Sequence, residues 1–285
     1  MANIRAIRAR IKSVESTRQI TASMKVIAAS KLRRVQALQS SLQRFETHIA
    51  SMFSSLMGAT SMQDSPYVKA PGSSGKVCYV MFVGNRGMCG VYNITLLKKL
   101  QTVLDEEERE TVLAVCGRWG KDIMSSFGIK IDKSFDEIED TPDISDIKGL
   151  CDWLLDIYLS GQVDEIKLIY QQFQSVLKQV PAVKQLLPIE ARENQTQALE
   201  YIFEPDSAGV QHELEHMYFE NSVYSTLLEA KRGEHAARMA AMTAASDNTD
   251  ELLKELELQL NHARQAAITT EITEIVGGAS ALQSM

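Results

Sequence analysis

Hydrophobic residues at the start of the chain recur every three or four positions, as they do along one face of an amphipathic helix. The pattern begins at Ile4, Ile7, Ile11 and Val14. Residues 1–57 contain neither proline nor glycine, which cost a helix interior about 3 and 1 kcal/mol. We therefore predict one long helix with the heptad seam of a coiled coil. After a weaker stretch of small residues, the seam returns at Val35, Leu38, Leu42, Phe45, Ile49, Met52 and Leu56.

The end of the chain has the same character. Residues 210–276 contain Gly233 as their only glycine and no proline, and no Phe, Trp or Tyr follows Tyr224. At about 1.5 Å per residue, the two helices would be roughly 85 and 100 Å long. We expect the regular pattern of the second helix to end at Gly277-Gly278. Its late part has a leucine seam, formed by Leu252, Leu253, Leu256 and Leu260.

Between these helices the periodicity changes to short apolar runs that alternate with amphipathic segments. This alternation predicts a parallel sheet that is covered by helices on both faces. We expect strands at 77–83, 111–116, 129–135 and 165–173, helices at 93–107, 119–127 and 143–159, and further extended pieces at 179–189 and 199–203.

The fold class is therefore α/β, with a central domain of mainly parallel sheet between two terminal helices. We predict an N-terminal coiled-coil helix over 1–57, a linker over 58–75, the α/β domain over 76–205 and a C-terminal coiled-coil helix over 209–285. Because the two helices lie at opposite ends of the sequence, they can pair as an antiparallel coiled coil if the middle domain returns the chain.

Charge is distributed unevenly along the chain, although the net charge is only −7. Residues 1–50 contain ten basic and two acidic side chains, whereas residues 210–285 contain five basic and twelve acidic ones. Oppositely charged helices attract each other, and the surplus positive face could meet an acidic partner. Nucleic acid is disfavoured as that partner, because the aromatic residues of a stacking platform are missing.

Two further observations bear on the class of protein. No run of about 18 apolar residues is present, so we expect no membrane-spanning helix. The four cysteines are widely spaced, which argues for reduced thiols in a cytoplasmic compartment and against a zinc site or a disulfide framework.

One motif suggests metal chemistry. The residues from His212 to His216 match the H-E-x-x-H pattern of zinc proteases, with Glu213 as the potential base. A third ligand is needed, and Glu229 and Glu234 are the nearest candidates. On a continuous helix Glu234 would lie roughly 27 Å from His216, far beyond coordination distance. We therefore favour a solvent-facing pair on a long helix.

The glycine-rich segment from Gly84 to Gly90 follows a predicted strand and precedes a predicted helix, where dinucleotide sites occur. However, Arg86 stands where the fingerprint requires a second glycine, and no Gly-Lys-Ser/Thr follows. A tight turn is the favoured interpretation, and a structural thiol is favoured for Cys89.

Three segments together resemble the gamma subunit of rotary, F-type ATP synthases of the bacterial type. Residues 10–33 resemble its N-terminal signature, residues 84–93 its R-G-[LM]-C-G-x-x-N turn, and residues 237–274 its C-terminal signature. The resemblance covers the chain from end to end. Departures are small and include Asn85, where aspartate is more frequent, and His262, where a basic residue is usual.

The resemblance implies the rotor shaft, or central stalk, of the complex. The terminal helices would turn inside a hexamer of alpha and beta subunits, and a Rossmann-like foot would sit with the epsilon subunit on the membrane c-ring. It implies no catalytic residue, no cofactor and no metal, since ATP is made at beta-subunit sites. It also implies a peripheral location on the cytoplasmic face of the cell membrane, reached only through the complex.

The resemblance also implies roles for particular residues. Those expected to touch the alpha/beta ring or to set coupling are Met24, Lys25, Lys31, Arg33, Arg34, Arg238, Arg264, Gln265 and Thr269. Those expected to build the turn are Arg86, Gly87, Cys89, Gly90 and Asn93. The alternatives are a free-standing coiled-coil adaptor, which would account for the helices and not for the signatures, and the zinc hydrolase.

Overall fold

The structure is a computed structural model that describes residues 2–57, 65–189 and 207–283. Its two longest elements are helix α1 (Ala2–Met57) and helix α5 (Ser207–Gln283), with 56 and 77 residues. Both helices were predicted. The C-terminal helix was predicted over 209–285, and α5 continues through Gly277-Gly278 to Gln283. Two glycines cost a helix only about 2 kcal/mol, and no proline follows them to stop its propagation.

The chain divides into two compact units, which are described separately. Unit 1 contains residues 1–27 and 239–285, and unit 2 contains residues 28–238. Each unit holds part of α1 and part of α5, because both helices are continuous across the division. None of the helices among the described residues is long and apolar enough to cross a membrane.

In unit 1 the two helices run antiparallel. Arg18 of α1 pairs with Asp250 of α5 at 3.2 Å, and Ile7 lies in a groove with Leu256 and Ala263. Residues further along α1 thus contact residues that come earlier in α5, as in an antiparallel pair. From the predicted leucine seam, Leu253 and Leu256 are buried and Leu252 and Leu260 are half-buried.

In unit 2 the helices also run antiparallel, since Gln39 accepts a hydrogen bond from Arg232 and the Phe53 ring stacks on Tyr218 at 4.7 Å. The predicted seam of α1 is only partly buried here. Val35 and Ile49 are buried, whereas the three residues of the alternate heptad position lie open: Leu38, Phe45 and Met52. The core of this unit joins α5 to the sheet and to α4 (Lys148–Leu159), and α1 contributes Val35, Ile49 and Phe53 to it.

Unit 2 is built on a five-stranded sheet with strand order β3-β2-β1-β4-β5. The pairs β1–β2, β1–β4 and β2–β3 are parallel, and β4–β5 is antiparallel. This arrangement agrees with the prediction of a mainly parallel sheet. The strands are β1 (Lys76–Phe82), β2 (Glu110–Cys116), β3 (Lys133–Phe135), β4 (Glu165–Ser175) and β5 (Lys178–Leu187).

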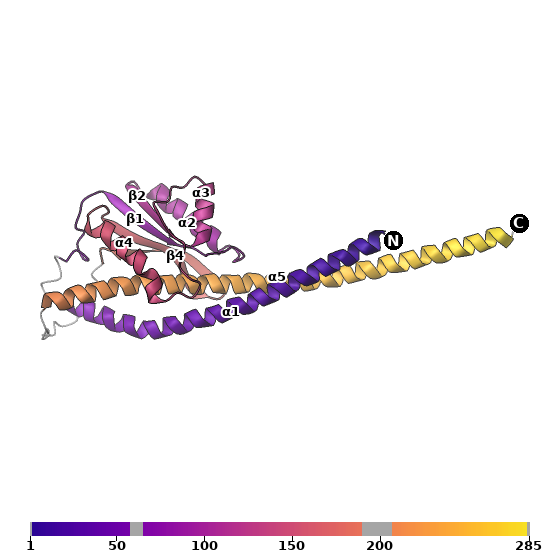
Figure 1. The fold of residues 1–285 in the computed structure, drawn as a ribbon, viewed down its shortest axis with the longest axis horizontal. Helices are drawn as coiled ribbons and strands as arrows, with labels where there is room; N and C mark the ends of the chain where they lie inside the picture. The colour runs from indigo at the N-terminus through magenta and orange to yellow at the C-terminus, as the bar shows by residue number, and fades with distance from the viewer. Residues whose placement is uncertain (1, 58–64, 190–206, 284–285) are drawn as a thin grey trace. The chain divides into compact units, whose positions relative to one another are not determined.

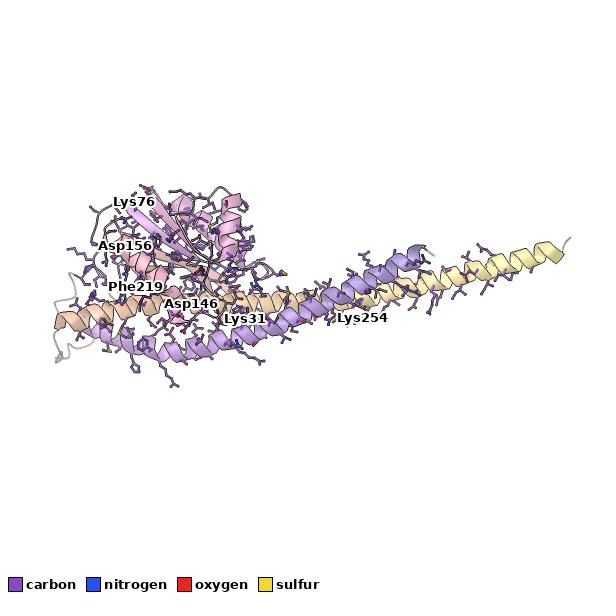
Figure 2. All side chains as sticks on the ribbon, in the orientation of Figure 1. Lys31, Lys76, Asp146, Asp156, Phe219 and Lys254 are labelled. Atoms are coloured by element: carbon purple, nitrogen blue, oxygen red, sulfur yellow. The ribbon has the colours of Figure 1, made fainter. Side chains whose placement is uncertain are left out.

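Both faces of the sheet are covered, as predicted (Figure 1). Successive residues of a strand point to opposite faces, and all of β1 from Val77 to Phe82 is buried. One face packs against α2 (Tyr92–Glu106) and α3 (Arg118–Ser126). The other packs against α4 and the two long helices, with Phe219 of α5 fully buried in this core (Figure 2).

Two middle elements differ from their predicted bounds. The strand expected over 129–135 is only β3, because the Asp132 carboxylate accepts the Leu113 N–H that strand pairing would use. The helix expected over 143–159 begins as a 3-10 turn, Ile144–Ile147, capped by Asp143. The extended piece expected over 199–203 and part of the predicted linker lie outside the described residues.

Candidate functional site

The glycine-rich segment after β1 forms a closed turn that leads into α2. Asn93 is 2% exposed, and its side-chain oxygen accepts the Gly84 N–H at 3.0 Å while its amide donates to the Arg86 carbonyl. Cys89 is buried, and its thiol donates to the same carbonyl. Gly90 has φ = +60°, a conformation that L side chains rarely adopt. The side chain of Asn93 thus holds the first half of the turn against the start of α2.

Helix α5 approaches this turn with a buried charged group. Glu234 is 1% exposed and accepts from Lys231 at 3.2 Å and from Arg238 at 2.8 Å. Arg238 also donates to the Arg86 carbonyl at 3.2 Å. Gly84 leaves room for Glu234, because a Cβ at this position would lie only 3.0 Å from the carboxylate. The carboxylate therefore fills the space beside the turn, which disfavours the dinucleotide alternative.

The carboxylate of Glu234 lies between two positive charges. Burial raises the pKa of Glu234, but the positive charges of Lys231 and Arg238 outweigh burial and leave that pKa below its usual value. Glu234 is therefore ionised at neutral pH. If one member of such a buried group is removed, an uncompensated charge stays in the interior and the folded state is strongly destabilised.

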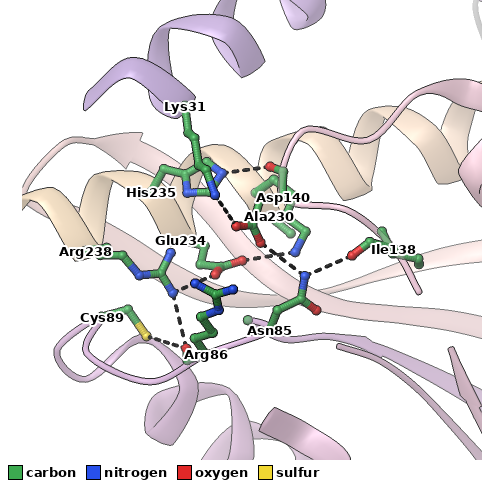
Figure 3. Close-up of polar contacts among 12 residues, drawn as sticks. Lys31, Asn85, Arg86, Cys89, Ile138, Asp140, Ala230, Glu234, His235 and Arg238 are labelled. Carbon is green, nitrogen blue, oxygen red and sulfur yellow. Dashed lines mark hydrogen bonds and ion pairs between the residues drawn. The ribbon is translucent and has the colours of Figure 1, made fainter. Parts of the chain in front are cut away.

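A second group of contacts surrounds Asp140, in the loop that follows β3 (Figure 3). Its carboxylate pairs with Lys31 of α1 and accepts from Asn85 at 3.1 Å. Its backbone carbonyl lies 2.8 Å from the Nε2 atom of His235. We call these residues, with the neighbouring charged group of α5, the polar cluster. Its members are Lys31, Asn85, Arg86, Asp140, Lys231, Glu234, His235 and Arg238.

Two residues expected to contact a partner belong to this cluster. Lys31 pairs with Asp140, and the Arg238 side chain is 11% exposed and bonded to Glu234. Contact with a partner would therefore compete with internal bonds. Arg33 and Arg34, which share the expectation, are exposed on α1.

The other expected partner residues lie in unit 1. Lys25 is exposed and Met24 half-buried on α1. Arg264, Gln265 and Thr269 are exposed on α5, with the Thr269 hydroxyl donating to the Gln265 backbone carbonyl. These side chains are open to a partner.

The H-E-x-x-H motif shows no metal site. His212 is exposed, and His216 lies 3.4 Å from Glu220. Across the described residues, no three His, Cys, Asp or Glu side chains gather as metal ligands. The four cysteines are buried and unpaired, and burial raises the pKa of Cys78 to about 12.

Sequence reasoning missed four members of the polar cluster as site residues: Asn85, Asp140, Lys231 and His235. Glu234 was noticed only as a remote zinc ligand. The available signal was the spacing of Lys231, Glu234 and Arg238 at i, i+3 and i+7, which places alternating charges on one face of a helix. Asp140 carried no such signal, because its partners are 55 to 109 residues away in the chain.

A family model and known proteins match this chain over nearly its full length. The family model described as ATP synthase matches residues 3–282. The "ATP synthase gamma chain" of Moorella thermoacetica is 40% identical over 283 residues, covering 99% of this chain and 100% of its own length. That of Desulforamulus reducens is 38% identical over 285 residues, with coverage of 99% and 100%.

Solved structures share the fold at lower identity. A chain in the Euglena gracilis mitochondrial ATP synthase structure of OSCP, F1 and c-ring matches with a TM-score of 0.69 and 16% identity, covering 99% of this chain and 95% of that one. A chain in the Tetrahymena thermophila central stalk and c-ring structure matches with a TM-score of 0.62 and 21% identity, covering 80% and 99%. Together with the full-length bacterial relatives, these findings show that the chain belongs to the family of ATP synthase gamma chains.

Proposed function

We propose that this chain is the rotor shaft of an F-type ATP synthase and couples ion flow through the membrane sector to ATP synthesis or hydrolysis. The observation that carries the proposal is identity of 40% across the full length of a bacterial gamma chain. As a gamma chain it is a non-catalytic subunit of a larger complex. Its contribution is therefore mechanical.

The proposed mechanism is conformational coupling by rigid-body rotation. A shaft with different side chains around its circumference presents a different surface to each catalytic site as it turns. Each site can then be shifted toward another nucleotide affinity by the contacts it makes, provided those contacts differ between its states. The long helices support this role, since the described part of α1 and α5 contains no proline to kink it.

We propose the alpha and beta subunits as a hexameric bearing around the coiled coil, and the epsilon subunit and c-ring as partners of the α/β domain. The exposed Lys25, Arg33, Arg34 and Arg264 supply positive charge for acidic surfaces of the ring. We place the complex at the cytoplasmic face of the cell membrane, where this chain is peripheral.

Co-purification tests this function. Affinity-tagged chain isolated from detergent-solubilised membranes should bring down alpha, beta and epsilon subunits in fixed stoichiometry, and the isolate should hydrolyse ATP. A chain recovered alone, or with unrelated proteins, would instead favour the coiled-coil adaptor. Stoichiometric zinc lost on His212→Ala would favour the hydrolase.

A further inference from the structure

Asp140 connects three parts of unit 2 that are distant in the sequence. Its carboxylate holds Lys31 of α1 and Asn85 of the turn after β1, and its backbone carbonyl accepts from His235 of α5 (Figure 3). Since a carbonyl can only accept, the Nε2 atom of His235 must carry the proton. One residue thus bonds both long helices to the end of the sheet.

The loop around Asp140 is itself firmly held. Asn85 also donates to the Ile138 carbonyl at 2.9 Å, and the Tyr224 hydroxyl of α5 donates to the Pro142 carbonyl at 3.0 Å. The carbonyls of three alternate residues therefore each accept a hydrogen bond from another element. Asp140 lies at the centre of this segment.

Asp140 remains charged under any physiological condition. Partial burial raises its pKa, but the hydrogen bond from Lys31, the charge of Lys231 and the bond from Asn85 hold that pKa well below the usual range. The link to Lys31 is therefore present throughout the working pH range. With side chains only 34% and 22% exposed, Lys31 and Asp140 are less screened than a surface pair.

Hydrogen bonds and ion pairs restrict the rotation of a helix about its axis more than apolar packing does. The hydrophobic attraction is non-directional, so apolar burial alone fixes the angle of a helix about its axis less sharply than directional bonds do. Hydrogen bonds and ion pairs depend on distance and angle and resist such turning. The helix residues bonded to Asp140 lie within four positions of the ends of unit 2 at Ala28 and Arg238, from which both helices continue.

We propose that Asp140 is a positioning residue that fixes the rotational setting of α1 and α5 against the sheet, so that torque applied to the α/β domain reaches the helices. The proposal rests on the proposed function as rotor shaft. It assigns to one loop residue a link to both long helices, beside the bonds that Tyr224 and Arg238 of α5 make to neighbouring backbone carbonyls.

The test uses the assembled complex in inverted membrane vesicles. Asp140→Ala removes both carboxylate links and leaves the backbone carbonyl for His235. We expect this variant to assemble and to hydrolyse ATP, but to pump several-fold fewer ions per ATP than the unaltered complex. Asp140→Glu, which restores the charge, should recover part of the loss. A merely structural role would lower assembly and hydrolysis together and would leave the ratio of ions to ATP unchanged.

The matched control is Glu139→Gln, which removes one negative charge from the exposed neighbour of Asp140 in the same loop. Its ratio of ions pumped to ATP hydrolysed should equal that of the unaltered complex. An unchanged ratio in assembled Asp140→Ala would overturn the proposal. If that variant does not assemble, the isosteric Asp140→Asn provides the same comparison.

A thermal double-mutant cycle on the full chain tests the link without the complex. Lys31→Ala and Asp140→Ala should each lower the unfolding midpoint by about 2–4 °C, and the double variant by clearly less than the sum. Strictly additive shifts would also overturn the proposal. Failure of the unaltered chain to co-purify with alpha and beta subunits would instead refute the rotor function, and the cycle would still report on the link.

Discussion

At the scale of single residues, His235 is held neutral by its surroundings. It is fully buried; Nε2 donates to the Asp140 carbonyl, and Nδ1 has no hydrogen-bond partner among the residues that the structure describes. Burial lowers its pKa below the usual value, an effect that Glu234 opposes and that Lys231 and Arg238 reinforce. Protonation would place a further cation in a cluster that already contains several.

This arrangement predicts a loss of stability in acid. Because the folded pKa of His235 lies below the unfolded value of about 6.5, the unfolded state binds more protons between the two values. The free energy of unfolding should therefore be highest above pH about 6.5 and should fall as the pH drops toward the folded pKa. His235→Gln keeps an N–H donor for Asp140 and should flatten this dependence, as measured by urea unfolding from pH 8 to 5. The exposed His262→Gln is the control; an equal flattening there would contradict the assignment.

Glu234 gives a second prediction at this scale. Glu234→Gln leaves Lys231 and Arg238 without their shared counter-charge in the interior. Breaking a buried ion pair in this way costs about 3–5 kcal/mol. We expect a loss near that size in urea unfolding at pH 7.5, against a change within about 0.5 kcal/mol for Glu251→Gln on the exposed face of α5. Similar values for the two variants would mean that the charged group is solvated.

At the scale of elements, the long helices and most strands could be predicted because their signals are local. The absence of proline and the heptad spacing predict α1 and α5, and continuous apolar runs predict β1 and β4. What could not be predicted depends on partners far along the chain. β3 is short because Asp132 takes a backbone N–H of β2, and the exposed Leu38 and Phe45 depend on where α5 lies in unit 2. The role of Asp140 was missed for the same reason.

The last part of α5 carries a prediction about partners. Arg264 and Gln265 are exposed, so replacing both with alanine should leave the stability of the free chain within about 0.5 kcal/mol of the original. If this face meets the alpha/beta ring, ATP synthesis driven by an ion gradient in membrane vesicles should fall several-fold. Lys98→Ala, exposed on α2, is the matched control and should synthesise ATP normally. Unchanged synthesis in the double variant would refute the proposed ring contact.

At the scale of the whole molecule, the two units differ sharply in how much they bury. Among the described residues of unit 1, the buried side chains are only Thr21, Met242, Leu253 and Leu256, whereas unit 2 holds both hydrophobic cores. Segments with little buried apolar surface open more easily than the core. In the free chain, backbone amides of residues 2–27 and 239–283 should therefore exchange with deuterium faster than those of β1 and β4, as measured by mass spectrometry. In the assembled complex, enclosure by the alpha/beta ring should slow exchange in unit 1 and leave β1 unchanged. Equal exchange of unit 1 in both states would mean that the helix pair finds no enclosing partner, which is incompatible with a shaft that turns inside a bearing.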